Sequence, residues 1–256
     1  MNALQDLVEL SHQLAEPHRD LVVLSEGNTS IRVGPRHMLV KASGASLGNA
    51  TTNDFVKVSL GSLLALLDDS TADDATVARV FEQASDGSQH PSVEAILHAV
   101  CMTTGSANVV AHTHPVPVNI LLCSEHGRQL ATDVIFPEQV VVLGPRPLYI
   151  PYVDPGLALA RAVRAEMSNH LEQHGIPPRL VYLANHGIFA LGQSANEVMQ
   201  ITEMAVKLSR IYAGALAVGA IRCLSQSEVE RIERRPDELR RRTILSSQTD
   251  RRLDGN

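Results

Sequence analysis

The hydrophobic and polar positions of this 256-residue chain follow helical and strand-like periods in turn. Apolar residues three and four apart indicate amphipathic helices, and the first, residues 1–16, places Leu4, Leu7, Val8 and Leu14 on one face. Further helices are predicted at residues 62–69, 77–84, 91–105, 116–127, 155–175 and 194–219. Short apolar runs bounded by turn residues predict strands at 21–24, 31–33, 37–42 and 108–114, a β-rich section at 138–150, and two strands within 179–192 that meet at Asn185-His186-Gly187.

These elements together predict an α/β chain in which helices cover a central sheet. A chain of this length buries one substantial core, so we expect one domain over residues 1–222. Residues 223–256 are rich in arginine and form the expected C-terminal helix or tail. Because acidic residues are interleaved with the first of those arginines, a solvated surface is the expected environment of that segment.

Composition excludes several classes of protein. A net charge of −6, 3% aromatic residues and no tryptophan argue against a nucleic-acid binder. No apolar run approaches the roughly 18 residues of a membrane span, and the start lacks a signal-peptide pattern. We therefore expect a cytoplasmic protein that binds neither nucleic acid nor membrane. Cys101, Cys123 and Cys223 form no CxxC motif and are expected to be small buried hydrophobic residues.

Two histidines lie one residue apart at the end of a predicted strand. In NVVAHTHPVPVN, residues 108–119, a β-branched run leads into His112 and His114, and Pro115 ends the strand. Because side chains two apart in a strand point to the same face, the two imidazoles should project together. His186 ends the apolar run LVYLA in a similar way. These histidines are either ligands of one metal ion or core side chains hydrogen-bonded to backbone carbonyls.

Three neutral imidazoles on strand ends are typical ligands of a catalytic Zn²⁺ ion, which keeps one coordination position open. A nearby carboxylate would supply the base. Glu94 is the best candidate, because it lies in the first turn of a predicted helix that leads into the histidine strand. His98 follows four residues later and shares its helix face.

Two turns of small residues form a second candidate feature. Residues 25–30 and 43–46 place glycine beside hydroxyl and amide side chains. Such turns can present backbone N–H groups to a phosphate or a carboxylate, and Lys41 would add positive charge. Because neither GxxxxGK[ST] nor GxGxxG is present, ordinary turns remain the alternative.

Taken together, these residues resemble the class II aldolase/adducin family, which includes L-fuculose-phosphate aldolase, L-ribulose-5-phosphate 4-epimerase and related sugar-acid decarboxylases. The resemblance covers residues 5 to about 220. Its motifs follow the family's order: Gly27-Asn28-Thr29-Ser30, Ser43-Gly44, Pro91-Ser92-Val93-Glu94, His112-Thr113-His114-Pro115 and Asn185-His186-Gly187. It implies a central, mostly antiparallel sheet flanked by helices, and a homotetramer with active sites at subunit contacts.

The resemblance also implies a set of site residues. A divalent metal, usually Zn²⁺ with Mn²⁺ or Co²⁺ as alternatives, would be held by His112, His114 and His186. Glu94 would be the acid/base that reaches the metal or the substrate. The residues that would hold a phosphate or carboxylate group of a sugar phosphate or sugar acid are Asn28, Ser43, Gly44 and Ser92, with Lys41 beside them.

The implied reaction is that of a metal-dependent lyase, which cleaves or forms a carbon–carbon bond of a ketose phosphate or related hydroxy-keto compound through a metal-stabilised enediolate. A decarboxylase of a keto sugar acid is the first alternative, an epimerase the second, and a non-catalytic adducin-like scaffold the third. Two departures from the family pattern bear on this choice. Val93 replaces the second serine of the family's Ser-Ser-Glu, and the aldolase tyrosine has no clear equivalent, with Glu138 as a candidate replacement or an ordinary loop carboxylate.

Overall fold

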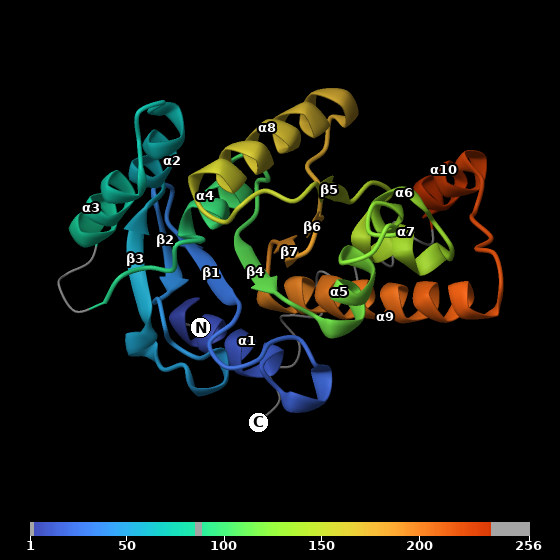
Figure 1. Ribbon diagram of the computed structural model, residues 1–256, viewed down its shortest axis with the longest axis horizontal. Helices are drawn as coiled ribbons and strands as arrows, with labels where there is room; N and C mark the ends of the chain where they lie inside the picture. The colour runs from blue at the N-terminus through green and yellow to red at the C-terminus, as the bar shows by residue number, and fades with distance from the viewer. Residues whose placement is uncertain (1–2, 85–88, 237–256) are drawn as a thin grey trace.

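Seven strands of the described chain form one sheet (Figure 1). The computed structural model describes residues 3–84 and 89–236. The strands are β1 Asn28–Val33, β2 His37–Lys41, β3 Phe55–Ser59, β4 Val109–Thr113, β5 Leu148–Ile150, β6 Leu180–Leu183 and β7 Gly187–Gly192. Their order is β3-β2-β1-β4-β7-β6-β5, and each neighbouring pair is antiparallel except β5 and β6. The expected mostly antiparallel central sheet is confirmed.

Helices cover both faces of the sheet, as Figure 1 shows. One layer contains α2 Leu60–Asp68, α3 Asp74–Ala84, α4 Ala95–Thr103 and α8 Leu157–His174. The opposite layer contains α1 Ala3–Leu14, α5 Val116–Leu122, α7 Pro137–Leu143 and α9 Ala195–Val218. Shorter pieces are η1 Pro17–Arg19, η2 Leu47–Asn49, η3 Thr52–Asp54 and α6 Gln129–Thr132, and α10 Gln226–Arg234 packs on α7. No helix among the described residues is long and apolar enough to cross a membrane.

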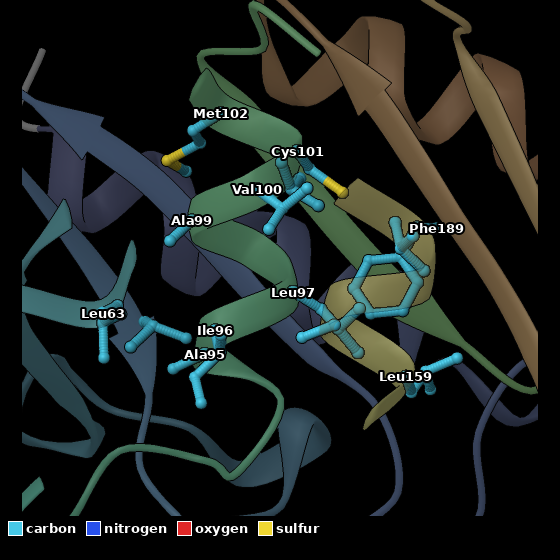
Figure 2. Packing of buried hydrophobic residues seen from close by; sticks show 14 of the residues in the cluster. Leu63, Ala95, Ile96, Leu97, Ala99, Val100, Cys101, Met102, Leu159 and Phe189 are labelled. Atoms are coloured by element: carbon cyan, nitrogen blue, oxygen red, sulfur yellow. The ribbon is translucent and has the colours of Figure 1, made fainter. Parts of the chain in front are cut away.

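Helix α4 is the most deeply buried helix of the first layer. Every side chain from Ala95 to Met102 is buried, because the helix lies between the sheet and helices α2 and α8. Figure 2 shows Leu97 of α4 close to Phe189 of β7, with Leu63 of α2 and Leu159 of α8 in the same cluster. A helix that is apolar on all sides except for one histidine, such as AILHAVCM, is stable only in this kind of position.

Two predicted strands are wrong for identifiable reasons. Residues 21–24 form a loop, in which Leu24 adopts the left-handed conformation at φ +57° and Val23 and Leu24 are exposed, so the run does not continue as a strand. Residues 138–143 of the predicted β-rich section belong to helix α7, which begins with a proline and ends before Gly144 at φ +80°. Its buried Val140 and Leu143 pack toward α9 and α10, and only Leu148–Ile150 is a strand. A short apolar run does not distinguish these two structures.

Other expectations fail in detail. Cys101 is buried as predicted, whereas Cys123 and Cys223 are exposed. Ser194 and Glu197 have the spacing of a capping box at the start of α9, but only half of it forms. The Ser194 side chain accepts from the N–H of Glu197, whereas the Glu197 side chain accepts from Gln193 N and pairs with Arg179. The expected domain boundary at residue 222 stays a prediction, since α10 packs on α7 and residues 237–256 lie outside the described residues.

Candidate metal centre

Three histidine rings converge at one end of the sheet. His112 lies in β4, His114 directly follows that strand, and His186 lies in the turn between β6 and β7. One nitrogen of each ring lies within 4.8 Å of the other two. The ring centroids are 4.7 Å apart for His112 and His114, 4.9 Å for His112 and His186, and 5.1 Å for His114 and His186. The two-residue spacing in the strand therefore does bring the first two imidazoles to one face.

The turn that carries His186 is held in place by its neighbours. Asn185 adopts the left-handed conformation at φ +54°, and its N–H donates to Leu122 O at 3.2 Å. Asn119 of α5 donates from Nδ2 to the carbonyl of His186 at 2.9 Å. Helix α5 thus fixes the β6–β7 turn beside the end of β4. Sequence reasoning missed Asn119, although it ends the stretch NVVAHTHPVPVN, because no pattern links it to a turn 67 residues away.

Gly187 allows β4 and β7 to approach each other at the histidines. A Cβ atom at this position would lie 2.5 Å from the Thr113 carbonyl oxygen and 2.7 Å from a ring carbon of His114. We expect Gly187→Ala to lower the free energy of unfolding by about 1–3 kcal/mol, measured by urea denaturation, and to weaken metal retention. Gly214→Ala is the matched control, because a Cβ there meets no atom within 4 Å. Equal stability of both variants would contradict this account.

Glu94 directs its carboxylate at the histidines. Its Oε1 lies 3.2 Å from Nε2 of His112 and 3.3 Å from Nε2 of His186. Burial raises the pKa of Glu94, but the His112 ring, with hydrogen bonds from both histidines and Asn28, outweighs burial and holds the pKa well below the usual carboxyl range. The group is therefore ionised and placed where it can accept a proton or approach a cation.

Pro91 and Ser92 lie along the end of β2, and Val93 and Glu94 form a turn, which corrects the prediction of a helix starting at Pro91 or Ser92. Pro91 forms an isolated β-bridge with Ala42, and Ser92 N donates to Lys41 O at 3.2 Å. Helix α4 consequently begins at Ala95. This pairing brings the 91–94 segment beside the end of β2, where the second small-residue turn begins.

Asn28 links this segment to the histidine strand. It lies directly opposite His112 in the β1–β4 register. Its Nδ2 donates to Glu94 Oε2 at 2.7 Å and to Ser92 Oγ at 3.3 Å. The structure thus brings Asn28, Ser92 and Glu94 together with the three histidines.

The second turn adjoins the same place through backbone contacts. Ser43 N donates to His90 O at 2.8 Å, and Gly44 adopts φ +78°. Lys41 is almost fully buried, and its Nζ donates to Ser25 O at 3.2 Å and to Ala45 O. Lys41 therefore joins the two turns, and burial lowers the pKa of its ammonium.

Two acidic residues have contrasting positions. Glu26, which sequence reasoning placed only within a turn, has its carboxylate 3.6 Å from Nδ1 of His114. Glu138, the candidate replacement for the family tyrosine, lies on α7 and lines a hollow beside Glu203 and Lys207 of α9. The structure does not bring Glu138 to the histidines within this chain.

The donor set fits a divalent cation. Nδ1 of His112 donates to Ile188 O at 2.9 Å, so Nε2 is the nitrogen that is turned toward the other two rings and available to a cation. His112 Nε2 and His114 Nε2 face each other at 2.8 Å. The pKa of His114 falls to about 4, first because of burial and then because of the neighbouring rings. Imidazole nitrogens that face one point are ligands that Zn²⁺, Mn²⁺ and Co²⁺ accept.

Solved structures with similar folds include a class II aldolase domain and two proteins named as aldolases. The N-terminal class II aldolase domain of a conserved protein from Thermoplasma acidophilum has a TM-score of 0.66 and 21% identity, over 83% of this chain and 94% of that one. L-fuculose-1-phosphate aldolase from Thermus thermophilus has a TM-score of 0.59 and 18% identity, over 87% of this chain and 98% of that one. A sugar-phosphate aldolase from Thermotoga maritima has a TM-score of 0.64 and 15% identity, over 86% of this chain and 97% of that one.

One curated relative has a different name. The chain is 26% identical over 186 residues to "Uncharacterized oxidoreductase YuxG" of Bacillus subtilis (strain 168), which covers 69% of this chain and 24% of that protein. The chain therefore spans about a quarter of that relative's length.

The sequence model of the Class II Aldolase and Adducin N-terminal domain matches residues 5–213, a range that contains the whole sheet and all three histidines. The chain belongs to the class II aldolase and adducin family.

Proposed function

We propose that this protein is a metal-dependent lyase that cleaves or forms a carbon–carbon bond of a ketose phosphate or related hydroxy-keto compound. The observation that carries the proposal is the ionised Glu94 carboxylate facing three convergent histidines. The family match supports the same reaction class, since L-fuculose-1-phosphate aldolase and sugar-phosphate aldolase are among the proteins of similar fold. An adducin-like scaffold would have no need of this arrangement.

In this proposal His112, His114 and His186 hold the divalent cation. When bound, the cation supplies Lewis-acid stabilisation of the negative charge that develops when a bond beside a carbonyl breaks. Three neutral ligands leave the full positive charge of the ion available for this purpose. The Nδ1 hydrogen bond of His112 to Ile188 O fixes the orientation and tautomer of that ring.

Glu94 is the proposed acid/base. Its Oε1 faces the histidines, while Oε2 is held by Asn28, so one oxygen is oriented and the other can exchange a proton with substrate. Asn28, Ser92, Ser43 and Gly44 form the proposed anion site. Lys41 supports that site by joining its two turns.

A decarboxylase of a keto sugar acid is the second candidate. Val93 is 50% exposed beside Ser92, where the family pattern has a second serine. A phosphate bound here would lose one hydroxyl partner, and a carboxylate needs fewer partners than a phosphate does. Incubation with sugar acids, scored for CO₂ release, tests this candidate beside a screen of small aldehydes with dihydroxyacetone phosphate and with pyruvate. Turnover in neither screen would reject both enzymatic proposals.

We also propose a homotetramer with sites at subunit contacts. Large apolar side chains are exposed close in sequence to the site residues, including Leu24 before Asn28, Val93 before Glu94, and Val116 and Ile120 after His114. Where such side chains form one contiguous patch, they are typical of surfaces that pack against another chain. Light scattering coupled to size exclusion chromatography measures the mass, and a monomer would reject this proposal.

Asn28→Ala tests the proposed anion site. A hydrogen bond to a charged group contributes about 1.5–3 kcal/mol, so we expect KM for an anionic substrate to rise by about tenfold or more. Loss of the Glu94 contact should lower kcat as well. Asn53→Ala is the control, because Asn53 is exposed in η3 and far in sequence from His112, His114 and His186. An unchanged KM would reject the assignment of Asn28 to the anion site.

A further inference from the structure

His98 is a polar side chain in a fully buried helix. It lies at the centre of the buried run Ala95–Met102 of α4, and its ring is 0% exposed. The other residues of that run are apolar or weakly polar, and they pack as Figure 2 shows. Burying an imidazole without hydrogen bonds is unfavourable, so a buried histidine is expected to have hydrogen-bond partners. The partners of His98 indicate its role.

Both ring nitrogens of His98 contact side chains of β1. Nδ1 lies 2.6 Å from Ser30 Oγ, and Nε2 contacts Asn28 Oδ1. Asn28 and Ser30 are two residues apart and therefore share the face of β1 that α4 covers. One imidazole thus connects the buried helix to the residue that lies opposite His112 in the sheet.

The direction of each hydrogen bond follows from the Asn28 amide. Its Nδ2 donates to Glu94 Oε2 at 2.7 Å and to Ser92 Oγ at 3.3 Å, so its Oδ1 is turned toward His98. A carbonyl oxygen only accepts, so Nε2 of His98 carries a hydrogen. Burial, with the nearby His112 as a smaller cause, lowers the pKa of His98 to about 3, so the ring is neutral near pH 7. Nδ1 therefore accepts from the Ser30 hydroxyl.

We propose that His98 is a positioning residue, which holds the Asn28 amide in the orientation that directs its NH₂ at Glu94 and Ser92, and so fixes the Glu94 carboxylate against the histidine cluster. The inference rests on the proposed role of Glu94. Without the Nε2–H donor, the Asn28 amide could rotate and place its oxygen beside the carboxylate, where two acceptors repel. The line of contacts runs from Ser30 through His98 and Asn28 to Glu94.

A merely structural role for His98 is the competing account. Its ring also meets Phe189 edge-on, with centroids 5.3 Å apart, so any large side chain at this position would fill space. Two substitutions separate the accounts. In His98→Gln the side-chain amide can supply an N–H near the place of Nε2, whereas His98→Leu fills the volume and supplies no donor.

Binding of Co²⁺ alone to the purified full chain gives a readout that needs no substrate. The visible spectrum of bound Co²⁺ reports the ligands around it, and titration gives the affinity. We expect His98→Leu to change the spectrum and to weaken Co²⁺ binding or turnover by about 10- to 100-fold, the usual effect of losing a partner behind a metal site. His98→Gln should restore both to within a few-fold of wild type. Similar values for the two variants, whether both impaired or both unimpaired, would overturn the proposal.

The tautomer of His98 is a second measurement that needs no variant. Nitrogen NMR should assign to His98 the imidazole signals that the wild type has and His98→Gln lacks, and these should show a neutral ring with its hydrogen on Nε2 near pH 7. A hydrogen on Nδ1 instead would overturn the proposal even if His98→Leu failed to fold. If the wild type turned over no substrate, the proposed lyase function would fail, while the tautomer and the Co²⁺ spectrum would still decide the role of His98.

Discussion

Replacing His112 with alanine should leave the purified protein without a bound divalent ion and without turnover. His112 is the central ligand of the proposed site, since its Nε2 faces both His114 Nε2 and Glu94 Oε1. Two imidazoles cannot complete the three-ligand set that a catalytic Zn²⁺ ion uses. Elemental analysis should find about one ion per chain in the wild type and essentially none in the variant.

The controls for this experiment separate ligand loss from misfolding. The His112 ring is fully buried and stacks on Phe189 with centroids 4.3 Å apart, so its removal also leaves a cavity. His186→Ala removes a ligand from a turn at lower structural cost and should lose the metal as well. His18→Ala, with a side chain that is 73% exposed on η1, should keep both metal and stability. Full metal retention in a folded His112→Ala or His186→Ala protein would refute the metal centre.

The local parts of this site were predictable from sequence, and their convergence was not. A strand ending in His112 and His114 fixes which way two rings point, because strand geometry has a period of two. His186 joins them only because β4 pairs with β7, where His112 lies opposite Phe189. No periodicity along the chain specifies that pairing. The expectation that the three rings meet came from the order of the family motifs.

The contacts behind the site were harder still to predict. His98 and Asn119 hold Asn28 and the His186 turn across separations of 70 and 67 residues. A histidine inside an apolar helix has the same pattern whether it packs passively or orients another side chain. The wrong prediction of strand at residues 138–143 has a similar cause. The run VVVL is compatible with a strand or a helix, and it forms helix α7 because its buried side chains pack against α9 and α10.

Glu94→Gln should keep the metal and lose turnover. Glutamine has nearly the same volume and leaves the three histidines unchanged, so metal content should stay near that of the wild type. It carries no charge and cannot accept a proton at neutral pH, and general acid–base groups contribute about 10²–10⁴-fold to rate. We therefore expect kcat to fall by about 10²–10⁴-fold, measured by steady-state kinetics on metal-loaded protein.

The two measurements on Glu94→Gln divide its possible roles. Loss of turnover with metal retained makes Glu94 the proton-transfer group, as proposed. Loss of both makes it chiefly a ligand, which the distance of 3.2 Å between Oε1 and His112 Nε2 would also allow. Glu166→Gln, an exposed carboxylate of α8, should change neither quantity. Full activity in Glu94→Gln would mean that the proton moves elsewhere, and Glu26, 3.6 Å from His114 Nδ1, is the next carboxylate to replace.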